Sequence, residues 1–512
     1  ELSVEVTPGE AGLLFFAVRA RSERVVLHRA EWVARGAAAG PVPLAVCYCT
    51  FNRESLLLRN VAALLRDRAV SGAITQIIVV DQGERKVRCH PDYPAVSARA
   101  GDRLRLVEQN NCGGAGGFTR GLLEAEAGGA GHVLLMDDDA VAEPESVLRA
   151  AAFLGLARGD VAVGGQMLDL RRPCELAEAA GRYRPDHVRV EEPVRRRVNR
   201  PSGVASLIRP EAGHYNGWWF CAFPLRLLGR VGLPLPLFLR GDDVEYGCRL
   251  FRAGVPTVSL PGVAVWHEPF ESKGHGWQPF YELRNLLIVG ALHFPGRGGA
   301  LVARRFISRL LDELLAYDYY EAWLLCEAVA AYLRGPGDLC RPPLPAHVRL
   351  LAARDELAPE VMPGGAALPA DAPAAPRSPR ARRLGQVVRN LLRPDPPADA
   401  FPVAVLRPAD EQWYAVAGRD VVAVAVRPGE WLVLRRARGR FVRLLLRGLG
   451  LALRLLVGQR RAARGWRAAA AGLAGRPFWA GHLRPDVGQD IGIKSAKKGA
   501  IADAAAPYEA VS

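Results

Sequence analysis

Apolar strand-like runs alternate with helix-like segments between residues 43 and 139, and this alternation limits the possible fold more than any other feature of the chain. The strand-like runs are short and bounded by polar residues, whereas the intervening segments repeat apolar residues every three or four positions. In order, the segments are PLAVCYCTF (43–51), RESLLLRNVAALLRD (53–67), ITQIIVVD (74–81), RLRLVEQ (103–109), GGFTRGLLEAEA (116–127) and HVLLMDDD (132–139). Successive strand–helix units predict an α/β domain with parallel strands.

Polar side chains stand where the predicted strands end: Thr50, Asp81, Asn110 and the carboxylates at 137–139. Because ligands bind beyond the carboxyl ends of the strands in such sheets, we expect these residues to share one edge. Side chains alternate along an extended chain, so Asp137 and Asp139 should point one way and Asp138 the other. Two converging carboxylates suit Mg²⁺ or Mn²⁺. The alternative is a solvated acidic turn.

The overall charge indicates an anionic partner. The chain has 68 Lys and Arg against 53 Asp and Glu, a net charge of +15. No aromatic-plus-basic RNA or DNA motif accompanies this charge, which argues against nucleic acid. The nine scattered cysteines are typical of a reducing compartment. No uncharged apolar segment is long enough to predict a membrane span.

Composition divides the chain into four parts. Residues 1–40 contain two β-prone runs and are interpreted as the remnant of an N-terminal β module. Residues 41–300 form the predicted catalytic α/β domain. Residues 301–485 are expected to be mostly helical, with a Pro/Ala-rich insertion at 355–400, and residues 486–512 to be a flexible tail.

A basic helix is predicted from about residue 438 to 472. No Asp or Glu occurs from Trp431 to Pro485. Several arginines in and before the helix recur at steps of three, four or seven, which places them on one face: Arg436, Arg440, Arg443, Arg447, Arg454 and Arg461. This face either belongs to the surface of a helical domain or lies against anionic lipid headgroups.

A second group of polar motifs lies downstream, in YNGWWFCAFP (215–224), FLRGDDVEYGCRL (238–250) and AVWHE (264–268). Asp242 and Asp243 precede a helical pattern, where aspartate is also a common N-cap. His267 ends an apolar run and could equally be a packed histidine. The order DxD, WW, DD, His along one α/β chain is more specific than any of its members.

The order and local contexts of these motifs resemble the inverting GT2 glycosyltransferases with a GT-A fold. More narrowly, they resemble the actinobacterial galactofuranosyltransferases that polymerise cell-wall galactan. The resemblance covers nearly the whole chain and is carried by CTFNR (49–53), VVDQG (79–83), NNCGGAGGFTRG (110–121), LLMDDD (134–139), GGQM (164–167), YNGWWF (215–220), GDDVEYGCRL (241–250), PGVAVWHE (261–268) and FYELRN (280–285).

The resemblance implies roles for individual residues. Mn²⁺ or Mg²⁺ would be held by Asp137, Asp139 and His267, and Asp243 would be the base that deprotonates the acceptor hydroxyl. The nucleotide sugar would be bound by Thr50, Arg53, Asp81, Asn110, Asp138, Gly114 and Gly117. The acceptor would be bound by Tyr215, Trp218, Trp219 and Asp242.

The implied reaction moves galactofuranose from UDP-galactofuranose to a polyprenyl-diphosphate-linked galactan acceptor. The enzyme would act peripherally at the anionic cytoplasmic face of the plasma membrane. In the family a complete β-sandwich precedes the catalytic domain, whereas only its last strands are expected here, so a homo-oligomer remains open. The alternatives are another GT2 transferase, such as a dTDP-rhamnose-using rhamnosyltransferase or a short-primer galactofuranosyltransferase, and a non-catalytic glycan- or membrane-binding descendant.

Overall fold

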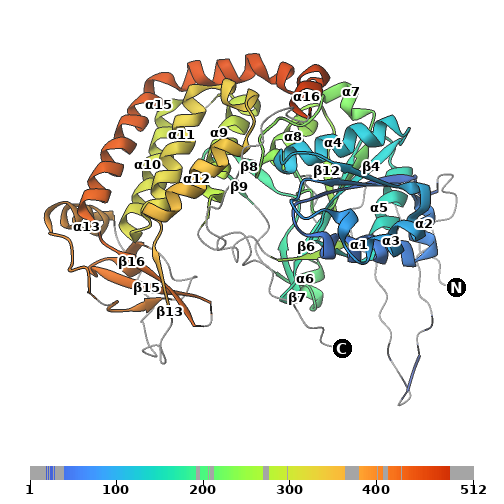
Figure 1. Cartoon of the computed structure of the whole chain (residues 1–512), viewed down its shortest axis with the longest axis horizontal. Coiled ribbons are helices and arrows are strands. Elements are labelled where there is room, and N and C mark those ends of the chain that lie inside the picture. The colour runs from blue at the N-terminus through green and yellow to red at the C-terminus, as the bar shows by residue number, and fades with distance from the viewer. Residues whose placement is uncertain are drawn as a thin grey trace.

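A computed structural model describes the chain from residue 40 to residue 484, together with residues 19, 21, 24–26 and 28, and without 192–195, 206, 208–212, 269–275, 297, 364–379, 401, 407–412 and 428. The predicted N-terminal β module and the predicted C-terminal tail lie outside the described residues. The described part forms an arch (Figure 1). An α/β domain lies at one end, a layer of long helices in the middle, and a small sheet at the other end.

A ten-stranded sheet forms the centre of the α/β domain, with the strand order β10-β7-β6-β11-β4-β1-β2-β3 and with β12 and β5 joined off this path. A further two-stranded ribbon pairs β8 with β9. The strands are β1 (Leu44–Thr50), β2 (Ile74–Asp81), β3 (Leu104–Glu108), β4 (His132–Asp137), β5 (Val141–Ala142), β6 (Ala162–Asp169), β7 (Arg172–Glu178), β8 (Arg182–Arg184), β9 (Arg189–Glu191), β10 (Arg196–Arg197), β11 (Cys221–Pro224) and β12 (Thr257–His267).

The first four strands confirm the predicted parallel arrangement. β1 lies between β2 and β4 and is parallel to both, and β2 is parallel to β3. The register aligns Thr50 with Asp81 and Cys49 with Asp137, so the predicted polar strand ends share one edge. The second half of the sheet differs from the prediction, because β11 is antiparallel to β4 and to β6. The sheet is therefore mixed.

Helices cover both faces of this sheet, as the alternation of apolar runs predicted. One face is buried under α1, α2, α3 and α5, and the other under α4, α7, α8 and α16. Their bounds are α1 (Glu54–Arg66), α2 (Arg68–Ala73), α3 (Tyr93–Ala100), α4 (Gly113–Ala127), α5 (Pro144–Leu156), α6 (Pro201–Ala205), α7 (Leu227–Val231), α8 (Asp242–Arg252) and α16 (Arg476–His482). Trp479 of α16 is fully buried against the α/β domain, so the end of the described chain returns to its beginning.

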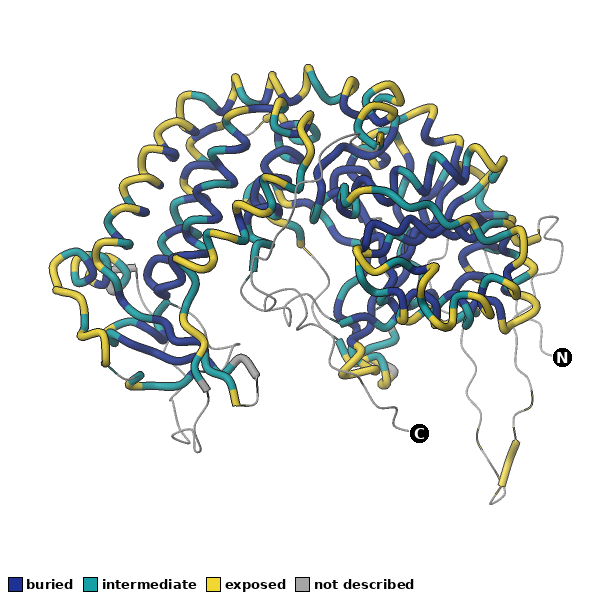
Figure 2. The backbone as a smooth tube through the Cα atoms, viewed as in Figure 1, coloured by how far each residue is buried: buried dark blue, intermediate teal, exposed yellow. Residues whose placement is uncertain are grey.

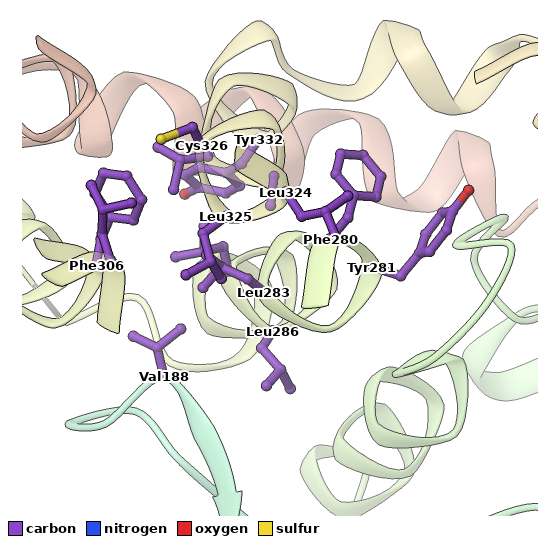
Figure 3. Close-up of a cluster of buried hydrophobic side chains, with 14 of the residues drawn as sticks. Val188, Phe280, Tyr281, Leu283, Leu286, Phe306, Leu324, Leu325, Cys326 and Tyr332 are labelled. Atoms are coloured by element: carbon purple, nitrogen blue, oxygen red, sulfur yellow. The ribbon is translucent and has the colours of Figure 1, made fainter. Parts of the chain in front are cut away.

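The middle of the arch is a helical layer with one continuous apolar core (Figure 3). Phe280, Leu283 and Leu286 of α9 meet Phe306 of α10 and Leu325 of α11 in this core. The helices are α9 (Gln278–His293), α10 (Gly299–Ala316), α11 (Tyr319–Arg334), α12 (Leu344–Leu357) and α15 (Arg438–Leu473).

The far end of the arch is a four-stranded sheet in the order β13-β16-β15-β14. Strands β15 and β16 pair as an antiparallel hairpin. Strand β13 and helix α13 fall within the Pro/Ala-rich segment 355–400. The elements here are β13 (Glu360–Pro363), α13 (Arg380–Leu392), β14 (Val405–Leu406), α14 (Trp413–Val416), β15 (Val421–Arg427) and β16 (Glu430–Arg435).

Helix α15 matches the predicted basic helix and runs along the outer edge of the arch (Figure 2). Arg443, Arg454 and Arg461 are exposed on it, as the periodicity predicted. Arg436 does not belong to that face. It precedes the helix, is 2% exposed, and donates to Asp420 Oδ1 at 2.8 Å. Among the described residues, no helix is both long enough and apolar enough to cross a membrane.

Candidate active site

The acidic turn after β4 is held in a defined shape. Asp137 is the last residue of β4, and Asp138 and Asp139 form the turn that follows. The Asn60 side-chain amide of α1 donates to the carbonyl oxygens of Asp138 and Ala140, each at 2.9 Å. Asn60 was not predicted from the sequence, where it stands with Arg59 as one of two polar residues in the segment LLLRNVAALL.

Asp137, Asp139 and His267 converge at the edge of the sheet. One ligand atom of each lies within 4.8 Å of the others. His267 ends β12, and its Nε2 lies 2.9 Å from Asp139 Oδ1. Arg53 forms an ion pair with the other oxygen of Asp139. Two carboxylates and an imidazole are a donor set that fits Mn²⁺ or Mg²⁺.

Asp138 is not part of this cluster and contacts Thr50 instead. Its Oδ2 accepts a hydrogen bond from Thr50 Oγ1 at 2.6 Å, and both residues are buried. Burial, together with the charge of Asp139, raises the pKa of Asp138 to about 7, although Arg53 and Thr50 act in the opposite direction. Asp138 and Thr50 therefore form a buried pair immediately behind the acidic cluster.

Asp81 lies at the same edge, and its carboxylate accepts hydrogen bonds from backbone amides. Its two carboxylate oxygens accept from the Gly83 amide at 2.9 Å and from the Val87 amide at 2.8 Å. Asp81 is fully buried, so it fixes the loop that follows β2. Asn110 is exposed, in the loop between β3 and α4.

The glycine-rich start of α4 brings the backbone close to the site. A Cβ on Gly114 would lie 3.1 Å from Asp242 Oδ2, and a Cβ on Gly117 would lie 2.1 Å from Cys49 Sγ. Gly114 therefore faces the candidate site, whereas Gly117 allows α4 to pack against β1. Gln82, which sequence analysis also missed, accepts from the Cys112 amide at 2.8 Å and donates to the Gly113 carbonyl at 3.0 Å.

Asp242 and Asp243 begin helix α8, where the helix dipole favours negative charge. Asp242 is 8% exposed. Burial and the neighbouring charge of Asp243 raise the pKa of Asp242 to about 8. Asp243 is only partly buried, and its Oδ1 accepts from the Val244 amide at 2.8 Å. The two carboxyl groups thus differ in environment although they are adjacent in the chain.

The loop that presents this pair is strained. Phe238 and Arg240 have φ values of 72° and 60°, in the left-handed region that non-glycine residues rarely adopt. Arg284 and Asn285 of α9 hold the loop in place. Arg284 donates to the Leu237 carbonyl at 2.7 Å, and Asn285 donates to the Arg240 carbonyl at 2.6 Å.

The aromatic residues predicted to bind the acceptor are packed in the interior. Tyr215, Trp218 and Trp219 are 3%, 5% and 3% exposed. Trp218 packs edge-on against Phe118, with 5.3 Å between the ring centroids, and Trp219 Nε1 donates to the Gly165 carbonyl at 2.9 Å. Their predicted contact with the acceptor stays a prediction.

The acidic cluster and the carboxylate pair belong to one site. The charge of Asp137 raises the pKa of Asp242, although less than burial and Asp243 do. After burial, the charges of Asp138, Asp137 and Asp242 each help to raise the pKa of the Cys49 thiol well above its usual value. A mixed α/β sheet with an acidic turn at its carboxyl edge and a carboxylate pair at the start of α8 defines a GT-A glycosyltransferase.

Comparison with known proteins narrows this class. Residues 41–279 match a family model described as "Glycosyltransferase like family 2". Galactofuranosyltransferase GlfT2 of Mycobacterium tuberculosis (strain ATCC 25618 / H37Rv) is 32% identical over 521 residues, which span 96% of this chain and 81% of that protein. GlfT2 of Mycolicibacterium smegmatis is 33% identical over 482 residues, covering 87% of this chain and 73% of that protein. The chain belongs to the GlfT2 family of galactofuranosyltransferases.

A shorter similarity extends to a second kind of galactofuranosyltransferase. GlfT1 of Mycobacterium tuberculosis (strain ATCC 25618 / H37Rv) is 34% identical over 177 residues, which span 32% of this chain and 51% of that protein. The similarity to GlfT2 covers a far larger share of the chain.

Proposed function

We propose that the protein transfers galactofuranose from UDP-galactofuranose to a polyprenyl-diphosphate-linked galactan acceptor, with inversion at the anomeric carbon. One observation carries the proposal. In a chain of the galactofuranosyltransferase family, a group suited to a divalent cation and a pair of carboxylates in unlike environments meet at the carboxyl edge of the sheet. A divalent cation held by the first group would stabilise the diphosphate leaving group. A carboxylate of the pair could accept the proton of the attacking hydroxyl.

The donor side is formed by the edge residues of β1, β2 and β4. When Asp137, Asp139 and His267 hold Mn²⁺ or Mg²⁺, the ion supplies positive charge that stabilises the departing diphosphate. Arg53, already at this edge beside Asp139, adds a second positive charge on the same side. Asp138 and Thr50 support the turn from behind.

The nucleotide is proposed to lie along the loops after β2 and β3. Asp81 shapes the first loop through its two backbone contacts, and each carboxylate oxygen keeps a second lone pair for the uracil. Asn110 is exposed in the second loop. Gly114 lets the donor approach the start of α4.

The acceptor is proposed to meet the carboxylate pair. Burial and the charge of Asp243 raise the pKa of Asp242, which favours its protonated form, and in that form it can donate a hydrogen bond to an acceptor oxygen. Asp243 is the more accessible member and accepts the proton of the attacking hydroxyl. Tyr215, Trp218 and Trp219 would contact the acceptor only after a local rearrangement, since they are buried.

We further propose a peripheral position at the cytoplasmic face of the plasma membrane. The face of α15 that carries Arg443, Arg454 and Arg461 is exposed and belongs to a stretch without acidic residues. Anionic headgroups attract such a face, by roughly 1 kcal/mol for each basic residue near the surface. A homo-oligomer is also compatible with this arrangement.

The proposed function is tested by incubating the protein with UDP-galactofuranose and a synthetic lipid-linked galactofuranosyl disaccharide. Product masses are compared between Mn²⁺ and EDTA. We expect a series of added hexoses with Mn²⁺ and none with EDTA. Transfer from dTDP-rhamnose instead of UDP-galactofuranose would replace the proposal by the rhamnosyltransferase alternative, and product formation that EDTA leaves unchanged would remove the metal from it.

A further inference from the structure

One line of side chains on helix α15 changes from apolar to basic along the helix. Its residues recur every three or four positions and therefore share one face: Leu446, Leu449, Leu453, Leu456, Arg460, Arg464 and Arg467. The four leucines are 64%, 48%, 61% and 50% exposed. This line is distinct from the face that carries Arg443, Arg454 and Arg461. We call it the α15 stripe.

The basic end of the α15 stripe forms one wall of a cavity of about 450 Å³. The opposite walls come from the β8–β9 ribbon, the end of α9 and the start of α10. They include Tyr183, Val188, Phe294 and Val302. The cavity is partly open, and its lining combines these apolar and aromatic side chains with arginines, a combination that can hold a ligand with an anionic and an apolar part.

The arginines at the rim carry charge that the described residues do not neutralise. Arg460 and Arg464 are exposed, and no described carboxylate forms an ion pair with either. Arg467 donates to the Ala291 carbonyl at 2.9 Å, which fixes its position without cancelling its charge. Guanidinium groups on successive helical turns suit the oxygens of a phosphate or diphosphate.

A buried amide lines the cavity. Gln459 is 7% exposed, and its side chain interacts with the Tyr332 hydroxyl, where it opposes the rise in pKa that burial causes. The amide oxygen has two lone pairs, so it can also accept a hydrogen bond from a sugar hydroxyl in the cavity.

The β8–β9 ribbon connects this cavity to the candidate active site. Val188, in the turn between the two strands, has a φ of 51°, which a β-branched residue rarely adopts, and it packs against the helical core (Figure 3). Tyr183 of β8 lines the cavity. Two residues earlier, Gly181 pairs with Tyr215, a candidate acceptor residue.

We propose that this cavity binds the anchor end of the lipid-linked acceptor. The three arginines bind the diphosphate, the first sugar lies beside Gln459 and Tyr183, and the prenyl chain lies along the leucines of the α15 stripe. This inference rests on the proposed function for the identity of the acceptor. Contact of the stripe with α15 of a second copy fits less well, because α15 offers no acidic side chain to meet these arginines.

Binding of farnesyl diphosphate to the full chain tests the site directly. We expect R460A/R464A to weaken binding about 10- to 100-fold, since two charge-assisted contacts are lost. R349A/R354A removes the same charge from exposed positions on α12 and should bind as the wild type does. Equal affinities of R460A/R464A and the wild type would overturn the proposal.

Two further ligands identify the source of the affinity. L449N/L453N should weaken binding of farnesyl diphosphate and leave binding of inorganic pyrophosphate unchanged. If pyrophosphate binds the wild type as tightly as farnesyl diphosphate does, the site recognises only an anion and the proposal fails. The proposal also fails if R460A/R464A reduces binding to phosphatidylglycerol vesicles equally with and without farnesyl diphosphate, because the arginines would then be a general headgroup contact.

Activity separates this inference from the proposed function. R460A/R464A should raise the KM for the lipid-linked acceptor and leave kcat with a lipid-free galactofuranosyl disaccharide unchanged. Absence of transfer to either acceptor by the wild type would contradict the proposed function, whereas the farnesyl diphosphate measurement would still decide the site. Unchanged UDP affinity and thermal unfolding in R460A/R464A would show that its fold is intact.

Discussion

Asp242 and Asp243 are neighbours in the chain but lie in unlike surroundings. Asp242 is buried beside Gly114, whereas Asp243 is partly exposed. Two adjacent carboxyl groups cannot both carry a charge at low cost, and burial favours the proton on Asp242, whose pKa is raised. The pair therefore offers a hydrogen-bond donor and a proton acceptor side by side.

We expect Asp243→Asn to lower kcat by about 10²- to 10⁴-fold, because the base is lost while the shape is kept. UDP affinity should not change, since Asp243 is on the acceptor side. Asp242→Asn is the matched comparison and should reduce kcat much less, because the amide also donates a hydrogen bond. Initial rates and calorimetric UDP binding measure both quantities. A larger loss in Asp242→Asn would reverse the two roles.

We expect Asp137→Ala and His267→Ala each to lower the Mn²⁺-dependent affinity for UDP by about tenfold or more, because an ion loses one of three protein ligands. Asp399→Ala, which removes an exposed carboxylate between α13 and β14, is the control. Titrations of UDP with Mn²⁺ and with EDTA give the affinities. If Mn²⁺ strengthens UDP binding equally in the wild type and in His267→Ala, then His267 is not a ligand.

At the scale of elements, the catalytic pair depends on a contact between the loop 238–241 and α9. Phe238 and Arg240 of the loop have an unfavourable backbone conformation. The Arg284 and Asn285 side chains donate hydrogen bonds to carbonyl oxygens of the loop segment. Arg284 is almost wholly buried, and burial lowers its pKa to about 10. The buried Arg284 guanidinium therefore serves to hold the loop before α8 in place.

We expect Asn285→Ala to lower kcat by about tenfold and the free energy of unfolding by about 1–3 kcal/mol, since carbonyl groups of the loop lose their donor. UDP affinity should be unchanged, which marks Asn285 as a positioning residue. Glu356→Ala, at an exposed position near the end of α12, should alter neither. Kinetics and denaturant unfolding provide the measurements, and a loss of stability without any change in kcat would make the contact purely structural.

A buried ion pair joins α8 to α9 and makes stability depend on pH. Burial alone would raise the pKa of Glu245, but Arg249 and His293 outweigh it and lower that pKa to about 2. A depressed carboxyl pKa stabilises the fold above the unfolded value, near 4.5, and this stabilisation disappears as the pH falls toward 2.

We therefore expect the wild type to lose about 3 kcal/mol of unfolding free energy through Glu245 between pH 4.5 and pH 2. Glu245→Gln should lack this part of the pH dependence. Glu145→Gln, an exposed control, should keep it. Denaturant unfolding of the three proteins across this range gives the comparison, and parallel curves for the wild type and Glu245→Gln would contradict the prediction.

Sequence reasoning predicted the elements better than the connections between them. Periodicity located β2 at Ile74–Asp81 and α15 at Arg438–Leu473 nearly to the residue, because each buries a regular apolar pattern. The antiparallel strand β11 was not predicted, because the segment CAFP is too short and too apolar to indicate the direction of a strand in the sheet. The left-handed backbone at Phe238 also has no sequence signal, because tertiary contacts from α9 impose it.

The same limit applies to the candidate site. The convergence of Asp137 and Asp139 was predicted, although Asp139 lies in a turn and not in the strand, whereas His267 was implied only by the resemblance of the motifs to the family. Whether Trp218 and Trp219 face a ligand or the core could not be predicted, since an indole suits both. Asn60 and Gln82 were missed because their partners are backbone groups of distant segments.

On the scale of the whole molecule, α15 joins the two ends of the arch. It follows directly from the small sheet at β16 and leads into α16, which is buried on the α/β domain (Figure 1). Along its course it packs against α9, α10 and α11 in one core. The helical layer therefore fixes the small sheet relative to the catalytic domain.

We expect Gly299→Ala to lower the free energy of unfolding by about 1–3 kcal/mol, because its Cβ would lie 2.4 Å from the Leu455 carbonyl oxygen of α15. Gly298→Ala is the matched control, since a Cβ there meets no atom within 4 Å, and it should change stability by less than about 0.5 kcal/mol. Thermal and denaturant unfolding measure both. Equal stabilities of the two variants would show that α10 can shift away from α15.

The strained loop before α8 also bears on how this enzyme could be engineered. A screen that selects only for heat resistance would favour glycine at position 240, because glycine adopts a φ of 60° without strain. The same change would make the backbone next to Asp242 and Asp243 more flexible. Catalysis requires these two carboxyl groups to keep their positions. Thermostable variants of this chain should therefore be chosen on turnover and melting temperature together.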